Sequence, residues 1–179
     1  MVYKAFLRVA WIRVSSRSYE EILSNSKPSE TFRLIFKTPT CFSALNKRYF
    51  YLFPEAKHVF GGLLKLWKLF SPIGRLDMEG EEEYTKWIAS QIGVSGYELS
   101  TRYITIGRRK AIGFTGWVNF RMGDGSEWRK LTNALGRLSE YTNVGKNRTG
   151  GFGVVEFVEK AREPDLRSTY RQTATQINL

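Results

Sequence analysis

The order in which strand and helix patterns follow one another restricts this chain to very few folds. Apolar and polar residues alternate from Thr31 to Pro39 with the period of a β-strand that buries one face. Six further segments follow. Residues 54–70 and 81–92 have the pattern of helices, and residues 97–106 and 111–122 have the pattern of strands. A helix pattern at 126–142 and a strand pattern at 154–158 complete the order. This is the β-α-β-β-α-β order of the ferredoxin-like α+β fold, with one inserted helix.

We expect this ferredoxin-like domain to span residues 31–159, because the segments on either side have a different character. Residues 1–30 contain a strand-like run, a short helical candidate at 18–23 and a polar break, and should form an N-terminal arm or linker. Residues 160–179 read as a polar C-terminal tail. A chain of 179 residues is long enough for one domain with its own core.

The helical periods also assign side chains to buried and exposed faces. In the first long helix the apolar stripe ends at Phe70, and His58 lies on the opposite, polar face, where we expect it to be exposed. In the last helix the apolar stripe ends at Tyr141. The exposed face of that helix should hold Arg129, Lys130, Asn133 and Arg137.

Cysteine, histidine and hydropathy exclude several classes of protein. The chain has one cysteine, Cys41, and one histidine, His58, so neither an internal disulfide nor a tetrahedral zinc site can form. No run approaches the ~18 apolar residues of a membrane-spanning helix, and charges interrupt the first residues where a signal peptide is apolar. We therefore expect a cytoplasmic protein without a metal or other cofactor.

The net charge favours a polyanionic partner. Lysine and arginine number 28 against 17 acidic residues, which gives +11. Between Thr101 and Gly150 there are ten basic and three acidic residues, so this stretch carries +7 of that total. A basic membrane-surface protein is the less favoured alternative, because the apolar stripes suit a core and the cations are spread over several elements.

Two segments within this basic stretch are candidates for binding phosphates. Residues 143–157, NVGKNRTGGFGVVEF, place four glycines and two cations between a helix and a strand, so backbone N–H groups could face an anion. The spacing matches neither a Walker loop nor a dinucleotide-binding fingerprint, and a tight structural connection is the alternative. The second segment is the basic tip of the hairpin that joins the two middle strands. The candidate RNA-binding residues are Gly145, Lys146, Asn147, Arg148, Thr149, Gly150, Gly151, Gly153, Arg108, Arg109 and Lys110.

The two middle strands carry aromatic residues that could stack RNA bases. We expect Tyr97, Tyr103 and Trp117 on open sheet faces, where aromatic residues of RNA-binding sheets stack bases. In the second of these strands Trp117 alternates with the buried positions, together with Asn119 and Arg121. Most of the other aromatic residues should lie in the core.

Four stretches of the sequence resemble, in the right order, the CRISPR-associated endoribonucleases that process CRISPR repeat RNA, which belong to the RAMP superfamily. The glycine-rich signature of that family is similar to LGRLSEYTNVGKNRTGGFG at residues 135–153. The other three are a strand that ends in Thr-Pro-Thr, a proline-started helix with a late tryptophan, and a Gly-Phe-x-Gly strand: FRLIFKTPTCF at 32–42, FPEAKHVFGGLLKLWKLFSP at 53–72 and AIGFTGWVNF at 111–120. The resemblance covers roughly residues 31–158.

The resemblance implies both an activity and a departure from the usual architecture. Family members usually have two tandem ferredoxin-like domains, with a catalytic histidine in the N-terminal one, and this chain resembles the C-terminal domain. The implied activity is metal-independent cleavage of repeat RNA, on the condition that a missing N-terminal half completes the chain. Besides repeat RNA, the implied partners are other CRISPR-associated subunits or that separate N-terminal half. The alternative is a non-catalytic RNA-binding subunit of a CRISPR ribonucleoprotein. His58 matches no catalytic position of the family, so the catalytic residues are left unassigned.

Overall fold

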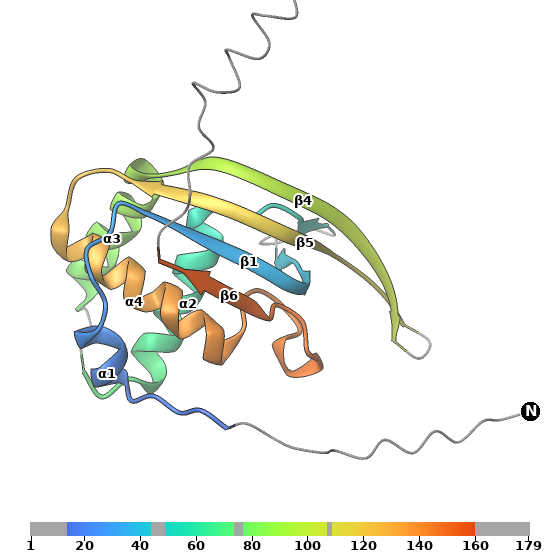
Figure 1. Ribbon diagram of the computed structural model, residues 1–179, viewed down its shortest axis with the longest axis horizontal. Coiled ribbons are helices and arrows are strands. Elements are labelled where there is room, and N and C mark those ends of the chain that lie inside the picture. Colours follow the sequence, from blue (N-terminus) through green and yellow to red (C-terminus); the bar gives the residue numbers. More distant parts are fainter. Residues whose placement is uncertain (1–13, 44–48, 74–76, 107–108, 160–179) are drawn as a thin grey trace, which may run out of the picture.

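The computed structural model describes residues 14–43, 49–73, 77–106 and 109–159 (Figure 1). Its main sheet is four-stranded and antiparallel, in the order β4-β5-β1-β6. The strands are β1 (Thr31–Thr40), β4 (Ile92–Ile106), β5 (Arg109–Met122) and β6 (Val155–Val158). The first and third strands of the β-α-β-β-α-β order are thus central and the second and fourth lie at the edges, so the ferredoxin-like α+β fold is confirmed.

Helices cover one face of this sheet (Figure 1). They are α2 (Ala56–Phe70), the inserted α3 (Met78–Gln91) and α4 (Ser126–Thr142). The smaller elements are α1 (Tyr19–Ser24), β2 (Phe42–Ser43), β3 (Phe50–Tyr51) and the 3-10 turn η1 (Arg148–Gly150). No described helix is both long and apolar enough to cross a membrane.

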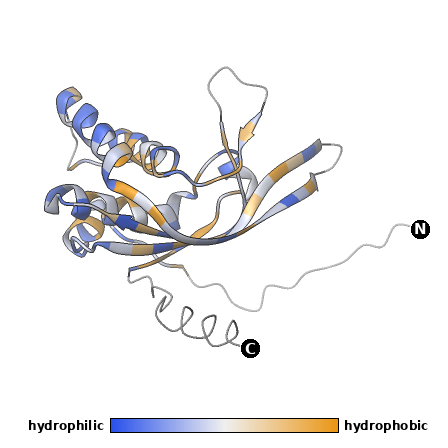
Figure 2. Cartoon of the chain, turned by 90° about the horizontal axis from the view of Figure 1, so that it is seen from above, coloured by the Kyte–Doolittle hydropathy of each residue, from blue (hydrophilic) through white to orange (hydrophobic). Residues whose placement is uncertain are grey.

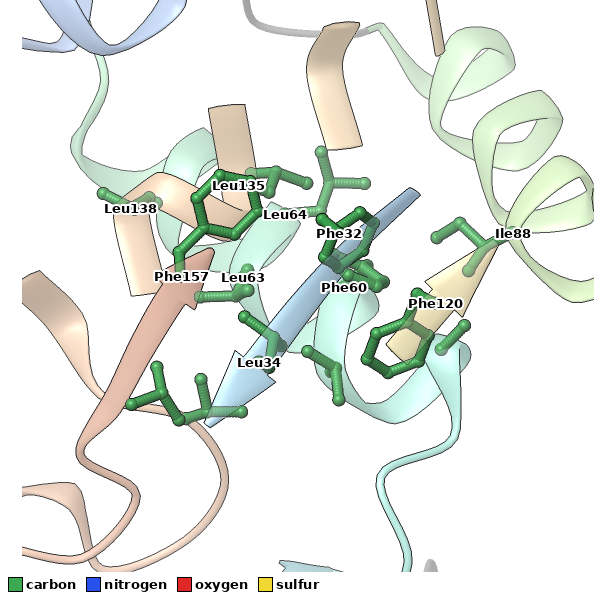
Figure 3. Close-up of a cluster of buried hydrophobic side chains, with 14 of the residues drawn as sticks. Phe32, Leu34, Phe60, Leu63, Leu64, Ile88, Phe120, Leu135, Leu138 and Phe157 are labelled. Atoms are coloured by element: carbon green, nitrogen blue, oxygen red, sulfur yellow. The ribbon is translucent and has the colours of Figure 1, made fainter. Parts of the chain in front are cut away.

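The core lies between the helices and the inward face of the sheet. Phe32, Leu34 and Phe36 of β1 are buried, as the alternation predicts, and the residues between them face the other way. The Phe32 ring contacts those of Phe60 and Phe120, at centroid distances of 5.6 and 5.2 Å (Figure 3). These contacts join α2 to the two central strands, and this sets the position of α2 against the sheet.

Helix α4 is buried on two sides, which corrects the expectation of one exposed polar face. Asn133 is fully buried, and its Nδ2 donates to the Ser29 carbonyl. Ile22 of α1 is also buried in the core, so part of the expected arm at residues 1–30 packs onto the domain. The helix period alone could not reveal this, because the covering segment lies about a hundred residues earlier in the chain. The expected strand-like run before Val14 and the tail at 160–179 lie outside the described residues.

Two residues expected in apolar stripes are exposed instead. Tyr141 of α4 is 47% exposed and Phe70 of α2 is 61% exposed. Each lies in the last turn of its helix, whereas the buried residues of the stripe lie in the preceding turns.

The register of the β4–β5 hairpin separates the three aromatic residues expected on open sheet faces. Tyr97 pairs with Val118, and Tyr103 pairs with Ile112. Directly paired residues point to the same side of a sheet, so both tyrosines lie on the helix side with buried Val118. Trp117 is therefore the one of the three on the open face.

On that open face Asn119 is buried, which corrects its expected exposure. The Arg33 guanidinium lies 4.1 Å from the centroid of the Trp117 ring, and its Nε donates to Asn119 Oδ1 at 2.7 Å. The arginine side chain therefore covers Asn119 across two neighbouring strands.

Candidate nucleic-acid interface

The glycine-rich loop, residues 145–153, connects α4 to β6 and is held by the end of β1. The Lys146 N–H donates to the Cys41 carbonyl at 2.9 Å, and the Gly153 N–H donates to the Pro39 carbonyl at 3.2 Å. The Val154 N–H donates to Thr38 Oγ1 at 2.9 Å. The Thr-Pro-Thr segment is therefore the support on which the loop is built.

Two of the loop glycines are required by the fold. Gly145 and Gly153 have φ of +83° and +72°, in the left-handed region that favours glycine. A Cβ at Gly145 would lie 2.5 Å from the Cys41 carbonyl oxygen, and one at Gly153 would lie 1.8 Å from the Val144 carbonyl oxygen. At these two positions glycine is needed for the tight structural connection that was the alternative interpretation of the loop.

The other two glycines lie on the exposed part of the loop. Gly151 also has a positive φ, of +81°, but a Cβ there would meet nothing within 4 Å. Gly150 has no positive φ, and its nearest Cβ neighbour would be a ring atom of Phe152 at 4.0 Å. Packing does not require glycine at either position, so this half of the loop is free to approach a ligand closely.

The same half of the loop presents backbone donors and positive charge together. Within the described part of the chain, the N–H groups of Asn147, Arg148 and Thr149 donate to no protein group. Asn147 has the left-handed conformation and Arg148 follows it, an arrangement that directs successive N–H groups outward. Lys146 is exposed, and its ammonium lies 4.7 Å from the centroid of the Phe50 ring.

A groove of about 650 Å³ lies between this loop and α2. Its described lining contains five cations, Lys57, Lys65, Lys68, Lys146 and Arg148. Glu81 is the only carboxylate among the described lining residues, and it pairs with Lys68. The groove therefore keeps an excess of positive charge, which suits the phosphates of a nucleic acid.

The middle of α2 forms an unusually open part of this groove. Gly61 and Gly62 line it, and a Cβ on either would meet nothing within 4 Å. Each glycine inside a helix costs roughly 0.5–1 kcal/mol relative to alanine. No neighbouring group requires glycine at these two positions. What the two glycines provide is an accessible helix surface beside the cations.

His58 also lines the groove, but it is not an exposed residue on a polar face as expected. Its side chain is only 18% exposed and packs against the rings of Phe42 and Tyr51, at centroid distances of 5.8 and 4.4 Å. Its Nδ1 is 3.8 Å from a carboxylate oxygen of Glu55. Burial lowers the pKa of His58 and Lys57 adds to this, while Glu55 opposes it, so the imidazole is neutral at neutral pH.

The basic hairpin tip is a separate feature. Arg109 begins β5 opposite Ile106, and Lys110 lies opposite Thr105 and is exposed. Arg108 lies outside the described residues. Of this segment, the described side chain of Lys110 does not line the groove, whereas Lys146 and Arg148 do.

Sequence reasoning missed the α2 side of this groove. Lys57, Lys65 and Lys68 were not among the candidate RNA-binding residues, and Gly61 and Gly62 were not singled out. A Gly-Gly pair inside a strong helix pattern was the available signal, because it carries a cost that the helix itself does not explain.

The family model for the CRISPR-associated endoribonuclease Cas6 matches residues 34–155, which include the loop, its support and most of the groove. The chain belongs to this family. A CRISPR-associated endoribonuclease Cas6 of Streptococcus thermophilus is 24% identical over 160 residues, which is 86% of this chain and 63% of that protein. The chain thus spans less than two thirds of the length of this Cas6 relative.

Solved Cas6 structures share the fold. Thermus thermophilus Cas6 (TTHB231) superposes with a TM-score of 0.72 at 24% identity, over 79% of this chain and 58% of that one. A product complex of a second Cas6 (TTHA0078) gives a TM-score of 0.67 at 23% identity, over 81% and 57% of the two chains. These likenesses agree with the ferredoxin-like topology described above.

The stretches that resemble the Cas6 family meet around the glycine-rich loop. Gly113 lets β5 approach the end of β1, since a Cβ there would lie 2.7 Å from the backbone nitrogen of Thr40. Next to it, the buried Phe114 ring contacts those of Phe36 and Phe42. In α2 the buried Trp67 donates from Nε1 to the Ile73 carbonyl at 3.1 Å. Of these Cas6-like residues, Gly113 and Phe114 pack at the end of β1 that supports the loop, whereas Trp67 joins α2 to the segment that follows it.

Proposed function

We propose that this Cas6-family chain binds CRISPR repeat RNA, with the sugar-phosphate backbone in the groove between α2 and the glycine-rich loop. The excess of cations along the groove is the observation that carries this proposal. In the loop, the N–H groups of Asn147, Arg148 and Thr149 can donate to phosphate oxygens beside the charges of Lys146 and Arg148. Gly145, Gly150, Gly151 and Gly153 shape the loop around these donors.

The basic hairpin is the second proposed contact with RNA. Arg108, Arg109 and Lys110 are consecutive cations, and they would bind phosphates at a distance from the groove. The RNA would then contact both the groove and the hairpin tip. The protein would act in the cytoplasm, in association with repeat RNA.

We further propose that this binding serves the processing of CRISPR RNA precursors by metal-independent cleavage. In that reaction the 2′-oxygen attacks the adjacent phosphorus, the bond from phosphorus to the 5′-oxygen breaks, and a 2′,3′-cyclic phosphate and a free 5′-hydroxyl result. A base removes the proton of the 2′-hydroxyl, an acid protonates the leaving oxygen, and positive charge stabilises the phosphorane. Lys146, Arg148 and the N–H groups of the loop would supply that charge. The acid and base would come from a second ferredoxin-like domain or another subunit.

A non-catalytic RNA-binding subunit is the second candidate function. The single histidine of the chain supports it, because its ring packs against Phe42 and Tyr51 and is only 18% exposed. We expect the purified chain to leave labelled repeat RNA intact in EDTA, and His58→Ala to change neither binding nor residual cleavage. Electrophoresis of the products checks this. Strong cleavage that disappears in His58→Ala would instead make His58 a catalytic residue.

The salt dependence of binding tests the proposed interface. We expect the affinity for a fluorescently labelled single-stranded CRISPR repeat RNA to fall steeply with salt, because phosphate contacts release counterions. Each phosphate neutralised on a single strand contributes a slope of ~0.7 in log affinity against log salt, so several contacts give a slope of several units. Fluorescence anisotropy between low and moderate salt measures this slope. A flat response would exclude an interface made of phosphate contacts.

A further inference from the structure

The β4–β5 hairpin extends beyond the rest of the sheet. Strand β1 pairs with β5 only as far as Phe114, whereas β4 and β5 remain paired to Ile106 and Arg109. Figure 2 shows this part of the hairpin projecting away from the helical layer, with hydrophobic segments along it. The outer half of the hairpin therefore has no described helix or third strand against it.

Large aromatic residues are exposed on the helix-side face of this hairpin. Tyr97 and Tyr103 are 59% and 83% exposed, and the register places both on that face. The Tyr97 ring meets that of Phe53 at 5.4 Å and 87°, a perpendicular contact that leaves much of Tyr97 accessible. Two more exposed aromatic residues, Tyr49 and Phe50, lie at β3, whose partner strand β2 contacts β5 through Phe42 and Phe114.

Cations accompany these rings. Lys110 pairs with Thr105 of β4. Because Thr105 is two residues after Tyr103 on the same strand, Lys110 and Tyr103 lie on the same face of the hairpin. The Lys146 ammonium of the glycine-rich loop lies over the Phe50 ring, beside β3. Exposed aromatic rings between cations are the arrangement by which proteins bind single-stranded nucleic acid, with bases stacked on the rings and phosphates near the charges.

We propose that Tyr97 and Tyr103 form a stacking surface for unpaired RNA bases, on the helix-side face of the hairpin. The two positions are six residues apart on one strand, a span of roughly 20 Å at the usual strand rise, so they contact different nucleotides. The occupant is single-stranded RNA, because Lys110 lies on the same face as Tyr103 and the protein carries a net charge of +11. The inference rests on the proposed RNA binding and adds base stacking to the phosphate contacts of the groove.

The test compares probes that differ in their bases but not in their charge. One is a labelled oligoadenylate of about 12 nucleotides, and the other is an abasic ribose-phosphate chain of the same length. We expect the parent to prefer the oligoadenylate and Tyr97→Ala/Tyr103→Ala to lose this preference, with at least about tenfold weaker binding to the oligoadenylate. Tyr97→Phe/Tyr103→Phe should retain the preference, since the phenyl ring still stacks. The slope of affinity against salt should be the same in all these proteins, because stacking neutralises no phosphate.

Tyr141→Ala is the matched control, because Tyr141 is also an exposed tyrosine but lies on α4. It should bind both probes like the parent. If the alanine pair keeps the preference for bases, Tyr97 and Tyr103 do not stack RNA and the proposed surface is wrong. If the parent binds neither probe nor repeat RNA, the proposed function itself fails, which is a distinguishable result. Circular dichroism confirms that each variant is folded.

Discussion

Gly153→Ala should destabilise the domain by about 4 kcal/mol or more, which is an exceptional effect for a single methyl group. The added Cβ would lie 1.8 Å from the Val144 carbonyl oxygen and 2.8 Å from the Val144 backbone nitrogen. Both are backbone atoms, and the Val144 N–H already donates to the Gly153 carbonyl at 2.8 Å, so relief requires this loop closure to open. The left-handed φ of +72° adds strain for any residue with a side chain. Urea unfolding, followed by circular dichroism, measures the change.

The same loop contains two controls for this prediction. Gly151→Ala shares the positive φ but has open space around the Cβ, so it should cost only the conformational strain, roughly 1–2 kcal/mol. Gly150→Ala has neither problem and should change the stability by less than about 0.5 kcal/mol. Equal effects at the three positions would contradict the described loop geometry.

Lys146→Ala with Arg148→Ala should weaken binding to repeat RNA by roughly 30- to 150-fold at low salt. Contacts between cations and phosphates are charge-assisted, and losing two of them is expected to cost about 2–3 kcal/mol in total. The slope of log affinity against log salt should also fall by about 1.4, which is ~0.7 for each lost phosphate contact. Folding should be unaffected, because the backbone bond from Lys146 to Cys41 does not depend on either side chain. Anisotropy at several salt concentrations, with urea unfolding alongside, separates the two effects.

A matched pair of alanines elsewhere controls for net charge. Lys27→Ala with Lys130→Ala removes the same charge from two exposed residues that do not line the groove. This pair should retain most of the affinity. If the loop variant folds and binds like the parent at both low and moderate salt, the loop is a structural connection and the groove is not the RNA interface.

The sequence by itself determined the order of the elements and the buried face of the central strand. Phe32, Leu34 and Phe36 are buried as predicted because strand side chains alternate, and this holds whatever the strand packs against. The glycine-rich loop was also identifiable, because four glycines around two cations stand out locally. The sequence could not divide those glycines into Gly145 and Gly153, which the fold requires, and Gly150 and Gly151, which packing does not.

Only the tertiary structure decided which residues share a surface. The α2 cations and Lys146 line one groove although about eighty residues separate them, because the helices pack on the same sheet face. The β4–β5 register put Tyr97 and Tyr103 on the helix side, apart from Trp117, and a shift of one residue would have reversed this. Asn133 is buried by a segment about a hundred residues earlier, and His58 is covered by Phe42 and Tyr51 of the β2–β3 pair. Periodicity describes one element at a time, whereas these outcomes depend on non-local pairing and packing that only the complete fold specifies.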